Sequence, residues 1–276
     1  MTAWRLWRAG QPVPAGLLGE WRLLDLEASL RRDLRQFSVA LDLLDRALAH
    51  APTEVKGRIL LNKFATLEQA GDTLAALATL QQVTPLVDAS GDARLRFGVC
   101  FNSIVILCHL GRYTDAEAGL PELSELAAGL GNQLDEVRLR WLSGRVAAGA
   151  GRREQAVAAF SQAARDFEDL GGAYDTALVS LDLAILYLEE ARDAEVAALA
   201  EQMVWIFDAR GVHREALAAL RLFCEAVRGR SVTAELASRV RDYLERARAD
   251  PGLPFDAGVA DVASQSRRRV QGGRRR

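Results

Sequence analysis

The sequence predicts an all-α protein, a right-handed α–α superhelix (solenoid) of stacked helical hairpins, on three observations. Proline is scarce, with seven residues in 276, as long helices require. No segment alternates apolar and polar residues as a half-buried strand does. Glycine recurs at multiples of 20 residues, and glycine just past a helix end is a common helix stop because it enters the left-handed conformation without steric cost. The glycines on this spacing are Gly71, Gly91, Gly111, Gly131, Gly151, Gly171 and Gly211.

A helix stop every 20 residues leaves room for a helix of about 16 residues, about 24 Å long, and a short turn. Alternate glycines then mark the turn inside a hairpin and the turn between hairpins, so the repeat has a period of 40 residues. At position 191 the series has alanine in place of glycine. We expect the turn at Ala191 to be tighter or less left-handed than its counterparts at Gly71, Gly111 and Gly151.

The helices of each predicted hairpin carry apolar columns. In the second helix the columns are spaced by four, three and four residues, which places them on one helix face. In the hairpin around Gly151 they are Ala156, Phe160, Ala163 and Phe167. The first helix of the same hairpin has columns at Trp141, Gly144 and Ala147. Each helix has one apolar face and buries it by stacking on its neighbours, which is the arrangement of a solenoid.

The repeat array is predicted over residues 20–249, as about five hairpins and a terminal capping pair. Residues 21–34 and 37–49 form the first hairpin, and residues 214–228 form the last of the regular first helices. Ser231 or Thr233 can cap a final helix over residues 234–249, whose Arg- and Glu-rich surface suits a terminal lid. The sequence Asp-Pro-Gly at 250–252 stops this helix, and we expect residues 250–276 to be a disordered, Arg-rich tail.

Residues 1–19 are predicted to be a partial repeat or an irregular lead-in. Trp4, Leu6 and Trp7 look like the end of a second helix that has no first helix before it. Such an end exposes an unpaired apolar face, and self-association through this N-terminal end is one partner expectation. We also expect either that the natural protein is longer at its N-terminus or that Met1 is an internal or misassigned start.

Two stretches resemble the tetratricopeptide repeat (TPR) family. Residues 138–163 supply a small residue, a turn glycine and the Ala–aromatic–Ala series of that family at Gly144, Gly151, Ala156, Phe160 and Ala163. Residues 37–52 supply Ala40, Leu44, Ala47 and a closing Pro52. The resemblance covers about residues 20–230, and the 40-residue period is similar to the long-helix variety found in bacterial regulatory proteins. HEAT-type repeats have a similar period, but the turn prolines expected of them are missing.

Composition and charge limit the function classes. The net charge of −2 includes six arginines and no acid in residues 267–276, which leaves −8 for the other residues. We expect nucleic-acid contact to be limited to weak, non-specific binding by this tail; the alternative is a tail that is only solvated. Charged residues interrupt every apolar run before the ~20 residues needed to cross a bilayer. Cys100, Cys108 and Cys224 lack a CxxC spacing and indicate reduced, packed thiols, so the sequence predicts a cytoplasmic protein without membrane contact.

The sequence contains no recognisable grouping for catalysis or metal binding. His50, His109 and His213 have no HxxxH or HExxH spacing, and no phosphate-binding glycine loop follows a strand. We therefore expect a protein that is not an enzyme and that has no cofactor and no metal site.

The groove lined by the first helices is the binding surface that the TPR resemblance implies. It places Asn62 and Asn102 where family members use Asn to bind a peptide backbone, with Asp182 at the equivalent position. An Asn side chain offers both a donor and an acceptor, and an Arg side chain can hold a carboxylate with two parallel hydrogen bonds. Polar helix residues that face water or the next hairpin are the alternative, and the full carboxylate clamp of chaperone-binding members is not matched. The nearby groove positions hold Arg58, Arg138, Arg145 and Glu189.

The sequence thus predicts a scaffold that binds a protein or peptide ligand in the concave groove, and the resemblance adds bacterial regulation as the context. An alternative is the sensor or oligomerisation part of a transcriptional regulator whose DNA-binding domain lies outside this chain. A second alternative is an enzyme hidden in a helical array, for which the sequence offers no grouping of acid, base and nucleophile.

Overall fold

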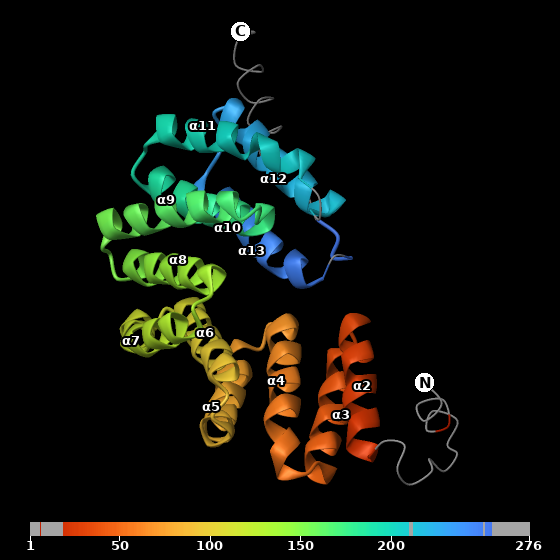
Figure 1. The fold of residues 1–276 in the computed structure, drawn as a ribbon. Helices are drawn as coiled ribbons and strands as arrows, with labels where there is room; N and C mark the ends of the chain where they lie inside the picture. The colour runs from red at the N-terminus through yellow and green to blue at the C-terminus, as the bar shows by residue number, and fades with distance from the viewer. Residues whose placement is uncertain (1–5, 7–18, 210–211, 251, 256–276) are drawn as a thin grey trace. The chain divides into compact units, whose positions relative to one another are not determined.

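The computed structural model describes residue 6 and residues 19–209, 212–250 and 252–255, and every regular element in these ranges is a helix (Figure 1). This confirms the predicted all-α class. The chain divides into two compact units, unit 1 (Met1–Leu142) and unit 2 (Ser143–Arg276).

Unit 1 is a series of helical hairpins in which each helix packs against the next one along the chain. The closest pairs are α2 with α3, α4 with α5 and α6 with α7, so α2, α4 and α6 are first helices and α3, α5 and α7 are second helices. Helix α8 begins in unit 1 and ends in unit 2. The bounds are α2 Glu20–Asp33, α3 Phe37–His50, α4 Thr53–Ala70, α5 Thr73–Ser90, α6 Ala93–His109, α7 Tyr113–Leu130 and α8 Gln133–Gly149.

Glycines end the helices at the predicted positions. The six predicted glycines between positions 71 and 171 all have positive φ, from 60° to 82°. Across Gly71 the amide of Asp72 donates to the carbonyl of Leu67 over 3.0 Å, and the amide of Arg112 donates to the carbonyl of Leu107 over 2.9 Å in the equivalent turn. Such bonds satisfy carbonyls that a helix end leaves open, and they require a left-handed residue between donor and acceptor. The seventh glycine, at position 211, lies outside the described residues.

Ala191 is left-handed as well, with a φ of 57°. The amide of Arg192 donates to the carbonyl of Tyr187 over 2.8 Å, the same bond that closes the glycine turns. The prediction of a less left-handed turn here is therefore wrong. The hydrogen bonding of the turn sets the backbone conformation, and alanine adopts it at a steric cost of about 1–2 kcal/mol.

The predicted apolar columns form the core of unit 1. Ala76, Leu80, Val83 and Val87 of α5 are each at most 3 % exposed. They belong to one buried cluster with apolar side chains of α4, including Phe64. Burial of this apolar surface is the main favourable contribution that holds α4 against α5.

Unit 2 continues the series with a shorter and less regular hairpin. Helix α11 has ten residues and passes directly into a 3₁₀ helix, η1. The bounds are α9 Arg153–Asp169, α10 Ala173–Glu189, α11 Asp193–Gln202, η1 Met203–Asp208, α12 Arg214–Arg228 and α13 Ala234–Ala249.

Gly144 allows α8 to approach α9 closely within unit 2. A Cβ atom at this position would lie 2.6 Å from the ring of Phe160, and Phe160 is 2 % exposed. Ala156 and Ala163 lie on the same side of α9 and are fully buried. The residues that carry the TPR resemblance therefore correspond to close packing of α8 on α9.

Helix α13 does not serve only as a lid at the end of the array, as the sequence suggested. Its contact with α10 is more extensive than its contact with α12, the helix that precedes it (Figure 1). The predicted cap is confirmed, because the hydroxyl of Thr233 accepts a hydrogen bond from the amide of Leu236 over 3.1 Å. Helix α13 therefore covers α10, the first helix of the preceding hairpin, in addition to its own partner α12.

The chain after α13 folds back onto that helix. The hydroxyl of Tyr243 donates to the carbonyl of Leu253 over 2.9 Å, and its ring packs on Phe255 with centroids 4.8 Å apart. Two residues beyond the predicted boundary at 250 thus contact α13. The predictions for residues 256–276 and for Trp4 and Trp7 lie outside the described residues.

Candidate functional site

Asn62 joins α4 to α2. Its amide nitrogen donates to Asp25 Oδ1 over 2.9 Å and to Ser29 Oγ over 3.0 Å, and its amide oxygen accepts a hydrogen bond from Arg32. Both the donor and the acceptor of this side chain are therefore used within the chain. A peptide backbone at Asn62 would have to replace these bonds, so the role predicted for this residue stays a prediction.

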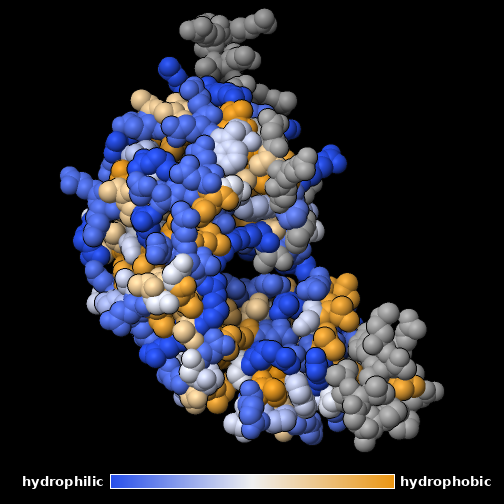
Figure 2. Space-filling view, viewed as in Figure 1, coloured by the Kyte–Doolittle hydropathy of each residue, from blue (hydrophilic) through white to orange (hydrophobic). Residues whose placement is uncertain are grey.

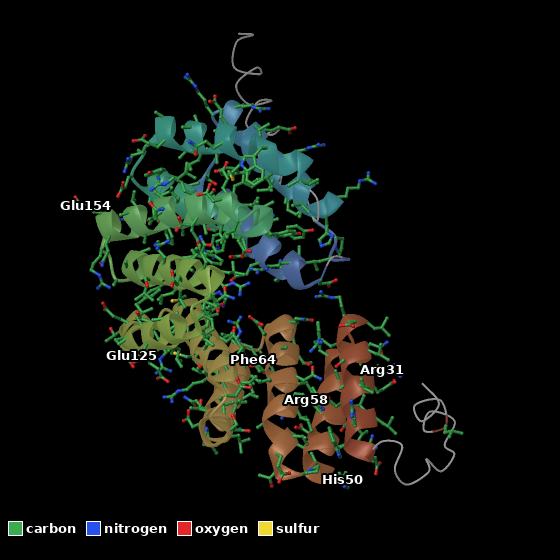
Figure 3. The ribbon with its side chains drawn as sticks, in the orientation of Figure 1. Arg31, His50, Arg58, Phe64, Glu125 and Glu154 are labelled. Carbon is green, nitrogen blue, oxygen red and sulfur yellow. The ribbon has the colours of Figure 1, made fainter. Side chains whose placement is uncertain are left out.

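Arg58 lies one helical turn before Asn62 on α4. Its guanidinium lies 5.6 Å from the ring centroid of Trp21 and 3.7 Å from Asp25 Oδ2. The side chain is 58 % exposed, so its cation stays accessible beside α2 (Figure 3). The structure thus brings together two of the predicted residues, Arg58 and Asn62, around Asp25.

Asn102 of α6 is half-buried and makes no hydrogen bond to any described residue. The contrast with Asn62 has a sequence cause. Asp25 and Ser29 precede Asn62 by 37 and 33 residues, and the residues at the same separations before Asn102 are Ala65 and Gln69. Asn102 therefore lacks the carboxylate that engages Asn62. One side of α6 also exposes Leu95, which is 40 % exposed and lies two turns before Asn102.

Arg138 lies beside a buried carboxylate near the start of α8. Asp135 is fully buried, and Arg138 Nη1 lies 3.8 Å from its Oδ1. Arg94 of α6 donates to the other carboxylate oxygen of Asp135. Asp135 lies in the first turn of α8, where the helix dipole also favours a negative charge. Arg94 thus joins α6 to α8 through Asp135, and Arg138 lies beside the same carboxylate within α8.

In unit 2, Asp182 and Arg145 are paired with α13. Asp182 Oδ1 accepts a hydrogen bond from Arg241 Nη1 over 3.1 Å, and Asp182 is 5 % exposed. Arg145 Nη1 donates to Glu245 Oε1 over 3.3 Å, and the Arg145 side chain is 9 % exposed. A third pair joins Arg248 Nη1 to Asp175 Oδ1 at 2.5 Å. The predicted groove residues of α8 and α10 therefore contact a helix of the chain itself.

The charge of Arg241 is stabilised by its surroundings. Burial disfavours the charged guanidinium, but the carboxylates of Asp182 and Asp242 outweigh this and raise the pKa of Arg241. Arg241 therefore keeps its positive charge beside Asp182.

Glu189 lies near the end of α10 and does not join this set. Its Oε2 lies 2.7 Å from Arg153 Nη1, at the start of α9, and both side chains are more than 40 % exposed. Exposed pairs of this kind contribute about 0–1 kcal/mol. The predicted groove role of Glu189 stays a prediction.

Solved structures provide the comparison for this arrangement of helices. A Rap protein complexed with Competence and Sporulation Factor is similar with a TM-score of 0.66 and 16 % sequence identity, over 85 % of this chain and 67 % of that chain. BtubC (BKLC) from P. vanneervenii is similar with a TM-score of 0.54 and 17 % identity, over 82 % and 94 % of the two chains. No protein-family model matches the sequence, and no curated protein matches it.

These similarities extend to the fold and no further at such low identities. The chain has a TPR-like helical repeat fold, an all-α solenoid in which helices stack in chain order. The TPR resemblance of the sequence is confirmed at this level.

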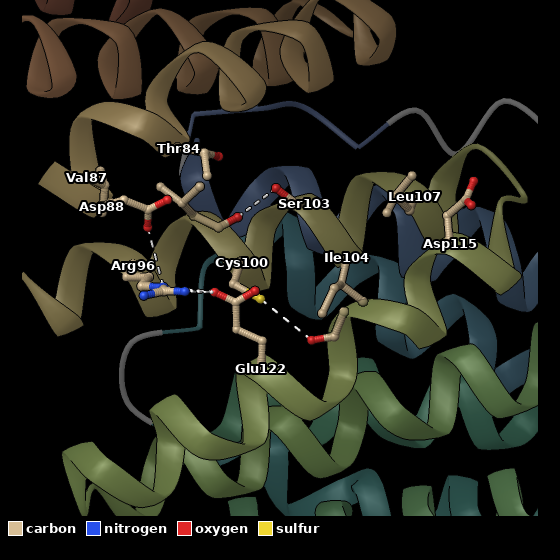
Figure 4. Close-up of a pocket in the computed structure, with 12 residues that line it drawn as sticks. Thr84, Val87, Asp88, Arg96, Cys100, Ser103, Ile104, Leu107, Asp115 and Glu122 are labelled. Carbon is tan, nitrogen blue, oxygen red and sulfur yellow. Dashed lines mark hydrogen bonds and ion pairs between the residues drawn. The ribbon is translucent and has the colours of Figure 1, made fainter.

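A small pocket lies between α5, α6 and α7 in unit 1 (Figure 4). Its volume is about 200 Å³, and Arg96 borders it with ion pairs to Glu122 at 2.8 Å and to Asp88 at 3.5 Å. Cys100 also lines it. Burial, with a smaller contribution from Glu122, raises the pKa of the Cys100 thiol to about 11. The thiol is therefore protonated at neutral pH, and the pocket holds no activated cysteine nucleophile.

No three His, Cys, Asp or Glu side chains among the described residues are grouped as metal ligands would be. No helix in the described ranges is both long enough and apolar enough to cross a bilayer. The three cysteines are free thiols, as the sequence predicts, and Cys108 and Cys224 are buried.

Helix α2 exposes a row of leucines at the N-terminal end of the described part of unit 1. Leu26, Leu30 and Leu34 lie four residues apart and are 45–66 % exposed, and Figure 2 shows apolar groups in this region. The self-association predicted from Trp4, Leu6 and Trp7 stays a prediction.

Several residues that hold α13 against α8 and α10 were not among the predicted site residues. They are Asp175 on α10 and Arg241, Glu245 and Arg248 on α13. One signal in the sequence could have indicated them: Asp175 and Asp182 of α10 are seven residues apart, and so are Arg241 and Arg248 of α13. Residues seven apart share a helix face, so the two helices carry complementary charges at matching spacing.

Proposed function

We propose that this protein is a non-enzymatic scaffold that binds a peptide or protein segment on the open side of α6 in unit 1, and that it acts in bacterial regulation in the cytoplasm. The observation that carries the proposal is a comparison within the repeat. Helices α6 and α10 begin two repeat lengths apart, at Ala93 and Ala173. The side of α10 that contains Asp175 and Asp182 binds α13, and the same positions of α6 are Leu95 and Asn102.

The open side of α6 has the chemistry of a peptide site. Leu95 offers exposed apolar surface, and Asn102 offers a donor and an acceptor that no described residue uses. On the neighbouring first helix, Arg58 provides an accessible cation. An apolar contact, a backbone hydrogen bond and a charge contact together favour a short peptide with an apolar side chain and an acidic group.

The comparison with the Rap protein supports a peptide ligand. That protein is solved in complex with Competence and Sporulation Factor, and it has the same helical repeat fold. The regulatory context rests on this similarity and on the period of the repeat, and the ligand chemistry rests on Leu95, Asn102 and Arg58.

A peptide library tests the proposal across many candidate ligands at once. A phage-displayed library of random 12-residue peptides is selected on the immobilised full chain, and the selected peptides are titrated by fluorescence anisotropy. We expect Asn102→Ala and Leu95→Ser each to weaken binding about tenfold, because each removes a contact that contributes about 1–1.5 kcal/mol. Asn62→Ala/Asn102→Ala and Arg58→Glu extend the test to α4.

Gln82→Ala is the matched control, because Gln82 is an exposed amide on the second helix α5. It should leave every affinity unchanged. Selected peptides whose affinities are the same for the wild type and all α6 and α4 variants would contradict the proposal.

A further inference from the structure

Helix α13 is bound to unit 2 in the manner of a ligand, and its register is defined by charge pairs. Arg241 pairs with Asp182 and Arg248 pairs with Asp175, so moving seven residues forward on α13 corresponds to moving seven residues back on α10. The two helices are therefore antiparallel along this contact. Between these two pairs, Glu245 of α13 reaches Arg145 of α8. The site on unit 2, here called the α10 surface, consists of Asp175, Asp182 and Arg145.

The α10 surface recognises a charge pattern. Its two acids face two arginines, and its one arginine faces an acid that lies between them in sequence. The occupant therefore reads Arg-x3-Glu-x2-Arg along one side of a helix. Each pair is charge-assisted, and its member on the α10 surface is buried: Asp175 and Asp182 are 9 % and 5 % exposed, and the Arg145 side chain is 9 % exposed.

These charges are unusual for a permanent helix contact. A buried ion pair is often no more stabilising than well-packed apolar side chains of similar size, because both ions lose their hydration. Carboxylates on the α10 surface have one clear advantage: they keep that surface compatible with water when the helix leaves it. The charge pairs are therefore compatible with a contact between α13 and the α10 surface that can dissociate.

The apolar side of α13 includes two alanines. Its buried residues are Ala237, Val240, Tyr243, Leu244 and Ala247. Apolar stabilisation scales with buried area, so the two alanines contribute less than larger apolar side chains do. The attachment of α13 to α12 through residues 229–233 also favours the docked state, because tethering raises the effective concentration of α13 at the site.

We propose that the α10 surface is a binding site for an amphipathic helix of a partner protein, one that carries Arg-x3-Glu-x2-Arg, and that α13 occupies this site until the partner displaces it. The partner reproduces the same three charge pairs. This inference goes beyond the function proposed above, because it concerns unit 2, a helical ligand and a different set of residues.

A peptide that copies α13 tests the site in the full chain. The probe is a fluorescein-labelled, end-capped peptide of residues 234–249. The protein variant Arg241→Gln/Arg248→Gln weakens the intramolecular contact and leaves the α10 surface intact. We expect this variant to bind the peptide at least about tenfold more tightly than the wild type, because a larger fraction of molecules has the site open.

Charge complementarity provides the specificity control. In the same background, Asp182→Arg should abolish binding of the peptide, and a peptide with Arg241→Asp should restore it. Arg239 is an arginine of α13 outside the three pairs, and a peptide with Arg239→Gln should bind as the parent does. A well-folded variant that binds no peptide, or one whose binding ignores Asp182→Arg, overturns the proposal.

A second measurement applies if the Arg241→Gln/Arg248→Gln variant loses helix content. Hydrogen exchange of the wild-type chain is then followed with and without excess unlabelled peptide of residues 234–249. We expect the amides of α13 to exchange faster with the peptide present and those of α10 to stay protected. Unchanged exchange in α13 overturns the proposal. So does a dimer that dissociates on addition of peptide, because the occupant would then be α13 of a second copy.

The two proposals fail separately. Variants of Leu95 and Asn102 should not change binding of the α13 peptide, and variants of Asp175 and Asp182 should not change binding of peptides selected on α6.

Discussion

Helices α6 and α10 occupy equivalent places in the repeat, yet one has an open side and the other is covered on nearly every side. Along α10 nearly every residue from Ala173 to Tyr187 is buried, including Ser180 and Asp182. Along α6, Asn102 and its neighbours Phe101 and Ser103 are half-buried. The apolar columns that stack hairpins are present in both helices. What differs is the remaining side, where α10 has two aspartates and α6 has a leucine and an asparagine.

This difference shows that the sequence specifies two properties of a first helix separately. The 40-residue pattern specifies how a first helix packs on its second helix. The residues on the remaining side specify what binds there, and in unit 2 the chain supplies the occupant itself. Substitutions that change the packing within a hairpin should leave binding on the remaining side unchanged, and the reverse should also hold.

Arg241→Ala should have the largest effect on stability, and it tests the side of α10 that α13 covers. It leaves Asp182 buried without its guanidinium partner, and we expect a loss of about 3 kcal/mol in the free energy of unfolding. Urea unfolding followed by circular dichroism measures it. The double variant Asp182→Ala/Arg241→Ala should recover most of the loss, and equal losses in the single and double variants would contradict the assigned pair.

Gly144→Ala should have the next largest effect, because it acts on the side of a first helix that faces its second helix. The new Cβ would lie 2.6 Å from the buried ring of Phe160, and such overpacking costs about 1–3 kcal/mol. The expected result is a lower urea midpoint.

Gly119→Ala is the matched control in unit 1. There a Cβ would lie 3.0 Å from an atom of Ile104, and the gain in helix propensity of about 1 kcal/mol offsets the crowding. A loss at Gly119 as large as the loss at Gly144 would contradict this interpretation.

Ala191→Gly should stabilise the protein by about 1 kcal/mol, because glycine adopts a φ near 57° without the steric cost that alanine carries. Thermal unfolding measures the change. The reverse substitution in the equivalent turn, Gly111→Ala, should destabilise by a similar amount, since a Cβ added there would have no atom within 4 Å and only the backbone conformation opposes it. A destabilised Ala191→Gly variant would show that the alanine side chain contributes packing.

The smallest expected effect concerns thiol chemistry. Because the pKa of Cys100 is raised to about 11, its alkylation by iodoacetamide should be slow at pH 8 and should accelerate as pH rises toward 11. Because the pKa of Cys100 in the folded protein lies above the ordinary cysteine pKa near 9, its contribution to the free energy of unfolding is fully present below pH 9. This contribution is lost as the pH rises from 9 to 11. Mass spectrometry of a Cys108→Ala/Cys224→Ala variant reports on Cys100 alone, and rapid reaction at pH 8 would contradict the burial of its thiol.

Regularities within one helix or one turn were predictable, and contacts between distant segments were not. The glycine spacing predicted left-handed turns, and the columns at Leu80, Val83 and Val87 predicted buried positions. The conformation of Ala191 was not predicted, because alanine in place of glycine indicated a less left-handed turn. The hydrogen bonds of the turn nevertheless require a left-handed residue at this position. Asn62 and Asp182 were recognised as polar residues on first helices, but their partners lie 37 and 59 residues away. No local pattern specifies such pairs, since each charge alone looks like a solvated residue on a helix surface.

The equal seven-residue spacing of Asp175 and Asp182 and of Arg241 and Arg248 has a mechanical consequence. If α13 slid along α10 by one helical turn, about 5.4 Å, both guanidinium groups would leave their carboxylates at the same moment. No intermediate shift keeps one pair intact, and only a displacement of two turns would bring one arginine opposite the other's aspartate. A slide of one turn therefore breaks both pairs together, and no register of α13 less than two turns from the observed one forms either pair.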